Sequence, residues 1–112
     1  MKDAVILVSR NGMGSADEKL QLTLIAKYFE LLLQSGTLPA AICFYTDGVR
    51  LVCEGSPVLE QLQKLESLQV RLICCSTCLN YFDLQAQVRV GIVGGMGDIL
   101  EAQIQAEKVI SI

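Results

Sequence analysis

The pattern with the clearest chemical potential is the cysteine pair in Cys75-Ser76-Thr77-Cys78, where an apolar run ends and a short helix is expected to begin. A cysteine reacts as a thiolate, and the free N–H groups and positive dipole end of a helix N-terminus lower the pKa of a thiol placed there. Two such thiols can form a transient disulfide, pass a sulfur atom between them or help to hold a metal ion. We therefore predict that Cys75 is a nucleophile and Cys78 its partner thiol. The alternative is that both are small apolar residues packed at a crowded strand–helix junction.

The composition excludes most other kinds of catalytic and metal site. The chain contains no histidine, so Ser-His-Asp catalysis, Cys-His catalysis and His-ligated metals are ruled out. A structural zinc site needs four ligands in paired spacing, whereas Cys43 lies in an expected strand and Cys53 stands alone. A thioredoxin-like site is also excluded, because both prolines, Pro39 and Pro57, precede the cysteine pair. We expect no metal and no organic cofactor.

Size, charge and hydropathy define the class of protein. The 112 residues are 52% hydrophobic and 19% charged, which excludes a disordered chain, and no apolar run is long enough to span a membrane. The net charge of −3 comes without a basic cluster, so nucleic acid is not an expected partner. The apolar run after Asp3 is too short for a secretory signal, which favours a cytoplasmic protein with reduced thiols.

Strand and helix patterns alternate along the whole chain. Apolar runs predict strands at 4–8, 40–45, 70–74, 88–93 and 108–112, and helical spacing predicts helices at 17–34, 57–68, 76–82 and 98–106. A helical turn is expected at 49–53 and a flexible glycine corner at 94–97. This alternation predicts an α/β fold: a three-layer α/β/α sandwich with a mainly parallel five-stranded sheet, formed by residues 1–112 as a single domain.

The loops that follow the strands are the places where sheets of this kind bind ligands. Besides the cysteines, the residues that we predict to line the site are Gly12, Asp47, Gly48, Ser76, Thr77 and Met96. Asp47 is suited to accept a proton or orient a hydroxyl, and the alternative is that it caps its turn. The glycines after the first strand let N–H groups point toward a small sulfur anion, and the alternative is that they serve tight backbone geometry.

The helix expected at 17–34 is apolar over an unusually wide arc. Its polar residues fall on one face, whereas its leucines, Ile25, Tyr28 and Phe29 spread over the remaining surface. Packing on one sheet face needs roughly half of that arc. We therefore predict a homo-oligomer, and the alternative is that a long loop covers the surplus.

Several stretches of the chain resemble a known family. They are Asp47-Gly48-Val49-Arg50-Leu51, Leu59-Glu60-Gln61-Leu62, Cys75-Ser76-Thr77-Cys78-Leu79-Asn80-Tyr81, Gly91-Ile92-Val93 and Ala106-Glu107-Lys108-Val109-Ile110. Together they are similar to the DsrE/DsrF-like family, and within it most similar to the C-terminal domain of YedF-type, sulfurtransferase-like proteins linked to selenium metabolism. The resemblance implies a five-stranded α/β/α domain that assembles into oligomers and handles persulfide or selenium.

The resemblance also implies roles for particular residues. The acceptor cysteine of the sulfur-relay members follows the third strand and matches Cys75, and Cys78 matches the second cysteine of the YedF-type motif. This chain has Ser76 where the family usually has glycine, and Gly95-Met96-Gly97 where it usually has Asn-Met-Tyr. Full-length members often carry an N-terminal TusA-like domain, so we expect a separate TusA-like protein as sulfur donor or acceptor.

These observations lead to one main hypothesis and two alternatives. The main hypothesis is a cytoplasmic sulfur or selenium carrier of the sulfurtransferase-like kind. In it, Cys75 attacks a persulfide on a donor protein, and Cys78 shields or resolves the product. The first alternative is a dithiol redox switch formed by Cys75 and Cys78. The second is a non-catalytic oligomeric binding module whose thiols are only packed.

Overall fold

Five strands form one all-parallel sheet in the computed structural model, which describes residues 3–112. The strands are β1 (Ala4–Val8), β2 (Ala41–Phe44), β3 (Arg71–Cys75), β4 (Ile92–Gly94) and β5 (Lys108–Ser111). Their order across the sheet is β4-β3-β2-β1-β5. All residues of β1 and β2 are buried, as the continuous apolar runs predict for strands covered on both faces. The predicted α/β fold with a five-stranded parallel sheet is therefore confirmed.

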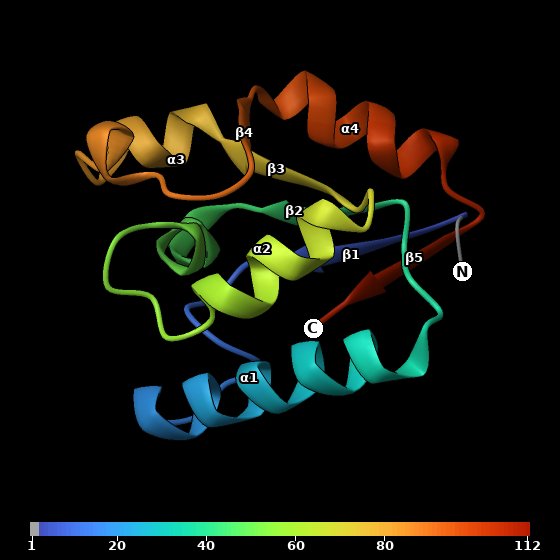
Figure 1. Ribbon diagram of the computed structural model, residues 1–112. Helices are drawn as coiled ribbons and strands as arrows, with labels where there is room; N and C mark the ends of the chain where they lie inside the picture. Colours follow the sequence, from blue (N-terminus) through green and yellow to red (C-terminus); the bar gives the residue numbers. More distant parts are fainter. Residues whose placement is uncertain (1–2) are drawn as a thin grey trace.

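The helices are distributed unequally over the two faces of the sheet. They are α1 (Glu18–Ser35), α2 (Leu59–Ser67), α3 (Ser76–Tyr81) and α4 (Met96–Gln105), with short 3-10 helices η1 (Thr46–Val52) and η2 (Gln85–Gln87). Figure 1 shows α1 and α2 on one side of the sheet and α4 on the other. The steps from β1 to β2 to β3 run in one direction, and the return from β4 to β5 runs in the opposite one. Right-handed crossovers therefore place α4 on the other face.

Helix α1 buries only part of its apolar surface. Asp17 caps its start, with a carboxylate that accepts a hydrogen bond from the Leu20 N–H at 3.0 Å, and Gly36 caps its end in the left-handed conformation. Ile25, Phe29 and Leu32 are buried, whereas Leu20, Leu24 and Leu31 are exposed. The predicted surplus of apolar surface is therefore present on the single chain.

The sequence predictions for the segment around β4 are wrong in two respects. The strand was expected over 88–93, but β4 covers only Ile92–Gly94, while Val88 forms an isolated antiparallel bridge with Cys53. The expected flexible corner at 94–97 is instead the start of α4, which begins at Met96. The reason is that Asp98 accepts a hydrogen bond from the Gly95 N–H at 2.9 Å, which fixes Gly95 as the cap of the helix.

The turn after β2 packs against the end of β1 at a glycine. A β-carbon on Gly48 would lie 2.1 Å from the carbonyl oxygen of Val8, and no side chain tolerates that distance. The Gly48 N–H donates to the carbonyl of Tyr45, and the Tyr45 N–H donates to that of Val8. This close approach joins the carboxyl ends of the two central strands.

Replacing this glycine should be costly. We expect Gly48→Ala to lower the free energy of unfolding by at least about 2 kcal/mol, because the added methyl group must push the turn away from β1. Urea denaturation followed by circular dichroism measures the change.

The matched control is Gly97→Ala in α4, where a β-carbon meets nothing within 4 Å. It should leave the stability unchanged or raise it by up to about 1 kcal/mol, since alanine favours the helix. Equal effects of the two substitutions would contradict the proposed role of Gly48.

Candidate functional site

The cysteine pair lies at the carboxyl-terminal edge of the sheet. Cys75 is the last residue of β3, pairs in register with Gly94 of β4 and forms the N-cap of α3. Cys78 lies one turn into α3, on the side of the turn that follows β2. The structure therefore confirms the predicted placement of both residues at a strand–helix junction.

The prediction that Cys75 is the nucleophile needs a thiol that a reagent can reach, and in the single chain the Cys75 thiol is not reachable. The residue is 0% exposed, whereas Cys78 is partly exposed. Cys75 still belongs to β3, and its side chain continues the inward packing of a strand whose last four residues are all buried. The backbone of Cys75 is at the mouth of the helix, but its sulfur is inside the protein. The accessible thiol of the pair is consequently Cys78.

The environment of Cys78 combines two opposing influences on its thiol. Its Sγ accepts a hydrogen bond from the backbone N–H of Thr46 at 3.1 Å, a contact that favours the thiolate. Burial has the larger effect and raises the pKa of Cys78 above its ordinary value, and the hydrogen bond with the Cys75 side chain raises it further. The two thiols therefore interact, but Cys78 is less acidic than a free cysteine.

Thr46 is a site residue that the sequence analysis missed. It has a φ of 48°, a left-handed conformation that is uncommon for a threonine. Its hydroxyl donates to the carbonyl oxygens of Ser9 and Tyr45, which holds the turn in place and aims the Thr46 N–H at Cys78. Nothing in the local sequence indicates this conformation, because the stabilising carbonyl of Ser9 is far away along the chain.

A second turn contact links η1 to the end of α3. The Arg50 Nε donates to an Asp47 carboxylate oxygen at 3.1 Å, and the guanidinium lies 4.3 Å from the centre of the Phe82 ring. Asp47 is thus paired with Arg50, rather than directed at Cys78 as a proton acceptor. Arg50 and Phe82 were also missed, since only the fold brings these residues together. Asp47 and Arg50 also line a shallow cavity of about 360 Å³ beside Arg10.

The remaining predicted residues lie around this edge in different roles. Ser76 and Thr77 are the first two residues of α3, the first half-buried and the second exposed. Met96 begins α4 with an exposed side chain. Gly12 is buried with a φ of 130°, and a β-carbon there would lie 2.4 Å from the backbone of Gln21. Gly12 therefore packs the loop onto α1.

The other three cysteines are core residues, as predicted. Cys43, Cys53 and Cys74 are all buried. Burial raises the pKa of Cys43 to about 11 and that of Cys74 to about 12, so both remain thiols at neutral pH. Within residues 3–112 there is no group of three or more Cys, Asp or Glu side chains arranged to hold a metal ion. In the same part of the chain no helix is both long and apolar enough to cross a membrane.

Comparison with known proteins identifies the family of the chain and finds solved structures with the same fold. The model of the DsrE/DsrF-like family matches residues 2–112. The ychN protein from E. coli superposes with a TM-score of 0.74 at 19% identity, covering 100% of both chains. MTH1491 from Methanobacterium thermoautotrophicum, a protein of unknown function, gives 0.71 at 18% identity, covering 97% of each chain. BT1422 from Bacteroides thetaiotaomicron, a conserved protein of unknown function, gives 0.64 at 17% identity, covering 98% of this chain and 95% of that one. At these identities the likeness concerns the fold, and no curated protein sequence matches the chain.

The burial of the five cysteines predicts the order in which they react. Brief treatment of the native protein with iodoacetamide should modify Cys78 first and leave Cys75 protected, as peptide mapping will show. The rate should keep rising above the pH of about 8.5 at which an ordinary thiol is half ionised, because the pKa of Cys78 is raised.

A variant separates the effect of burial on the pKa of Cys78 from the effect of the neighbouring Cys75 thiol. In Cys75→Ala the neighbouring thiol is removed, so the midpoint of the rate against pH should move down, whereas Cys43→Ala should leave it unchanged. Faster labelling of Cys75 than of Cys78 in the wild type would contradict this account of the site.

Proposed function

The chain belongs to the DsrE/DsrF-like family, which is linked to sulfur relay, and from this premise we propose that it carries sulfur on the Cys75–Cys78 thiol pair. The observation that supports the proposal most directly is the placement of a buried thiol and a partly exposed thiol one helical turn apart at the carboxyl edge of a parallel sheet. The active sites of open parallel sheets are typically built at that edge.

The burial pattern supports a reaction order in which Cys78 acts first. Its thiolate attacks the terminal sulfur of a donor persulfide, the sulfur–sulfur bond of the donor breaks, and the donor leaves as a thiolate. Cys78 then holds the persulfide. The Cys75 thiolate next attacks the Cys78 sulfur, which releases hydrosulfide and leaves a Cys75–Cys78 disulfide. Alternatively, an acceptor removes the outer sulfur before Cys75 reacts.

The raised pKa of Cys78 counts against a redox sensor that meets its oxidant free in solution. Sensor cysteines are accessible and have a low pKa, because oxidants attack the thiolate. Cys78 has a raised pKa and Cys75 is buried, so neither thiol of the pair fits that description. The burial of Cys75 favours a second candidate, a non-catalytic binding module in which the two thiols only pack together.

The proposal extends to the type of sulfur carrier, its partner protein and its location in the cell. We place the chain nearest the YedF-type, sulfurtransferase-like proteins because Cys75-Ser76-Thr77-Cys78 matches both cysteines of their motif. A separate TusA-like protein then supplies or receives the sulfur, or selenium in its place. A cytoplasmic location fits this chemistry, because the thiols must be kept reduced between cycles.

Reaction with a persulfide tests the carrier. After incubation with glutathione persulfide, intact mass and peptide mapping should show the Cys75–Cys78 disulfide in the wild type. Cys75→Ala should retain one added sulfur atom on Cys78, because the resolving thiol is missing. Cys78→Ser should take up no sulfur, because its remaining cysteines are buried.

The alternatives give different results in the same experiment. A redox switch forms the disulfide with hydrogen peroxide, producing water, but Cys75→Ala then accumulates no added sulfur from the persulfide. A binding module shows no change of mass with either reagent. Either outcome would exclude the carrier.

We also propose that the chain is a homo-oligomer, on the basis of two exposed apolar helix faces. Leu31 of α1 is 63% exposed beside Leu24, and Ile104 of α4 is 71% exposed beside Leu100. Large apolar surfaces of this kind are rarely left in water by soluble proteins. Self-association would bury them.

Sedimentation measures the assembly directly. We expect the wild type to sediment as a species larger than the 12.2 kDa monomer at micromolar concentration. One of the double variants Leu24→Gln/Leu31→Gln and Leu100→Gln/Ile104→Gln should dissociate it and so identify the interface. A wild type that is monomeric over the whole concentration range would refute the oligomer.

A further inference from the structure

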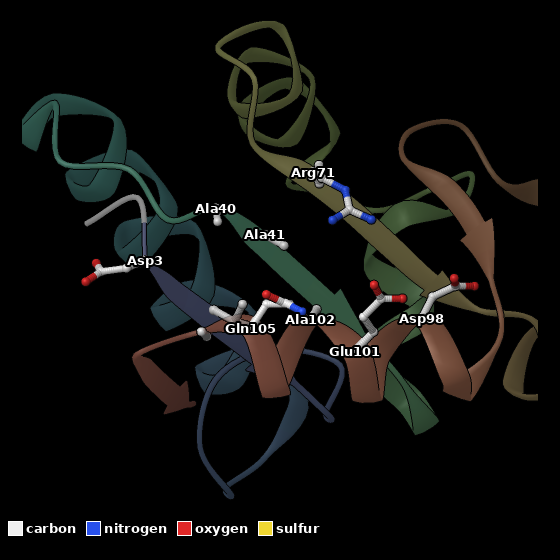
Figure 2. A pocket seen from close by; sticks show the side chains of 10 residues that line it. Asp3, Ala40, Ala41, Arg71, Asp98, Glu101, Ala102 and Gln105 are labelled. Carbon is white, nitrogen blue, oxygen red and sulfur yellow. The ribbon is translucent and has the colours of Figure 1, made fainter.

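Another cavity lies toward the opposite end of the strands from the cysteine pair. It encloses about 270 Å³ between α4 and the amino ends of β1, β2 and β3. Figure 2 shows this space with Ala40 and Ala41 of the β2 region beneath it, Arg71 on one side and α4 on the other. Val5 and Ala41 are buried, so part of the lining is apolar.

Side chains of opposite charge lie on the two sides of this cavity, too far apart to form an ion pair. In Figure 2 the Arg71 guanidinium and the Glu101 carboxylate are directed toward the space between β3 and α4, whereas the Asp98 carboxylate is directed toward the start of its own helix. Among residues 3–112, no carboxylate lies close enough to Arg71 to form an ion pair. Arg71 is exposed at the first position of β3, so its charge is available to a ligand.

The carboxylates differ in the hydrogen bonds that they already make. Asp98 accepts the hydrogen bond from the Gly95 N–H that caps α4, whereas Asp3 lies at the far end of the cavity, where its backbone carbonyl accepts from the Glu107 N–H. Glu101 lies between them on α4 and makes no side-chain hydrogen bond or ion pair with any of residues 3–112. The cavity thus presents one cation, Arg71, and opposite it on α4 the unpaired carboxylate of Glu101, above an apolar floor.

We propose that this cavity binds a small zwitterion of the size of a single amino acid. Its carboxylate pairs with the planar guanidinium of Arg71, its ammonium group with Glu101, and its apolar side chain contacts Val5 and Ala41. The volume is slightly below the range of about 300–1,000 Å³ that suits drug-sized ligands, so the ligand is small. A ligand with one charge leaves either Arg71 or Glu101 unmatched, which is why the zwitterion is favoured.

This binding site is independent of sulfur transfer. The cavity lines the amino ends of β1 to β3, whereas Cys75 and Cys78 lie at the carboxyl edge. A failure of either proposal therefore leaves the other untouched.

Three ligands that differ only in charge test the proposal. L-norvaline carries both charges on an apolar chain, pentanoate lacks the ammonium group, and butylamine lacks the carboxylate. Each is titrated into the 15N-labelled chain while the backbone amides of Ala40, Ala41 and Ala102 are followed by NMR. We expect norvaline to shift these amides with a dissociation constant near or below about 1 mM, and each single-charge analogue to bind at least about tenfold more weakly.

Variants assign the binding to the two opposed charges. Arg71→Gln and Glu101→Gln should each weaken norvaline binding at least about tenfold, whereas Lys27→Gln on α1 should leave it unchanged. The variant spectra also report whether each protein is folded. The proposal is overturned if norvaline causes no shifts at these amides, or binds no better than pentanoate or butylamine. Shifts that depend on protein concentration alone also overturn it, because they indicate a second copy of the chain in the cavity.

Discussion

Gly48 lies so close to the carbonyl oxygen of Val8 that the turn after β2 has little freedom to move. The same turn carries Thr46, whose N–H is aimed at the Cys78 sulfur, and Arg50, whose guanidinium lies over Phe82. The environment of the thiol pair is therefore assembled by contacts between the ends of three neighbouring strands. A displacement of this turn changes the position of the hydrogen-bond donor and the packing of α3 together.

The thiol pair combines protection with limited reactivity. Cys75 is shielded from solvent by the fold, and Cys78 is only partly covered but has a raised pKa. Such a pair reacts slowly with diffusing oxidants, because attack requires a thiolate that solvent can reach. A reagent held against the edge of the sheet needs the same thiolate, but its high effective concentration at Cys78 offsets the small thiolate fraction. The geometry is thus better matched to exchange with a docked partner than to sensing.

Local patterns in the sequence predict the strands and helices well, but they do not predict which side chains the packing of these elements buries. The run Ala4–Val8, the Asp17 cap and the placement of Cys75 at a strand end follow from periodicity and capping chemistry alone. The burial of Cys75 does not, because it depends on packing between elements distant in the sequence. The same holds for the left-handed Thr46 and for the convergence of Arg71 and Glu101, which the fold brings together across thirty positions. The hydrogen bond from the Gly95 N–H to the Asp98 carboxylate likewise makes a helix start of the segment that was expected to be a flexible corner.

The position of β1 inside the sheet has a consequence for biosynthesis. Its two neighbours are β2 and β5, and in the second pair Ala4 lies in register with Lys108. Closing a loop of that length carries a large entropic cost, so this pairing forms late and slows folding. Until β5 has left the ribosome, one edge of a fully apolar strand has unpaired N–H and C=O groups, the kind of surface that recruits other chains. In a nascent chain of this topology that edge of β1 therefore stays open until β5 pairs with it.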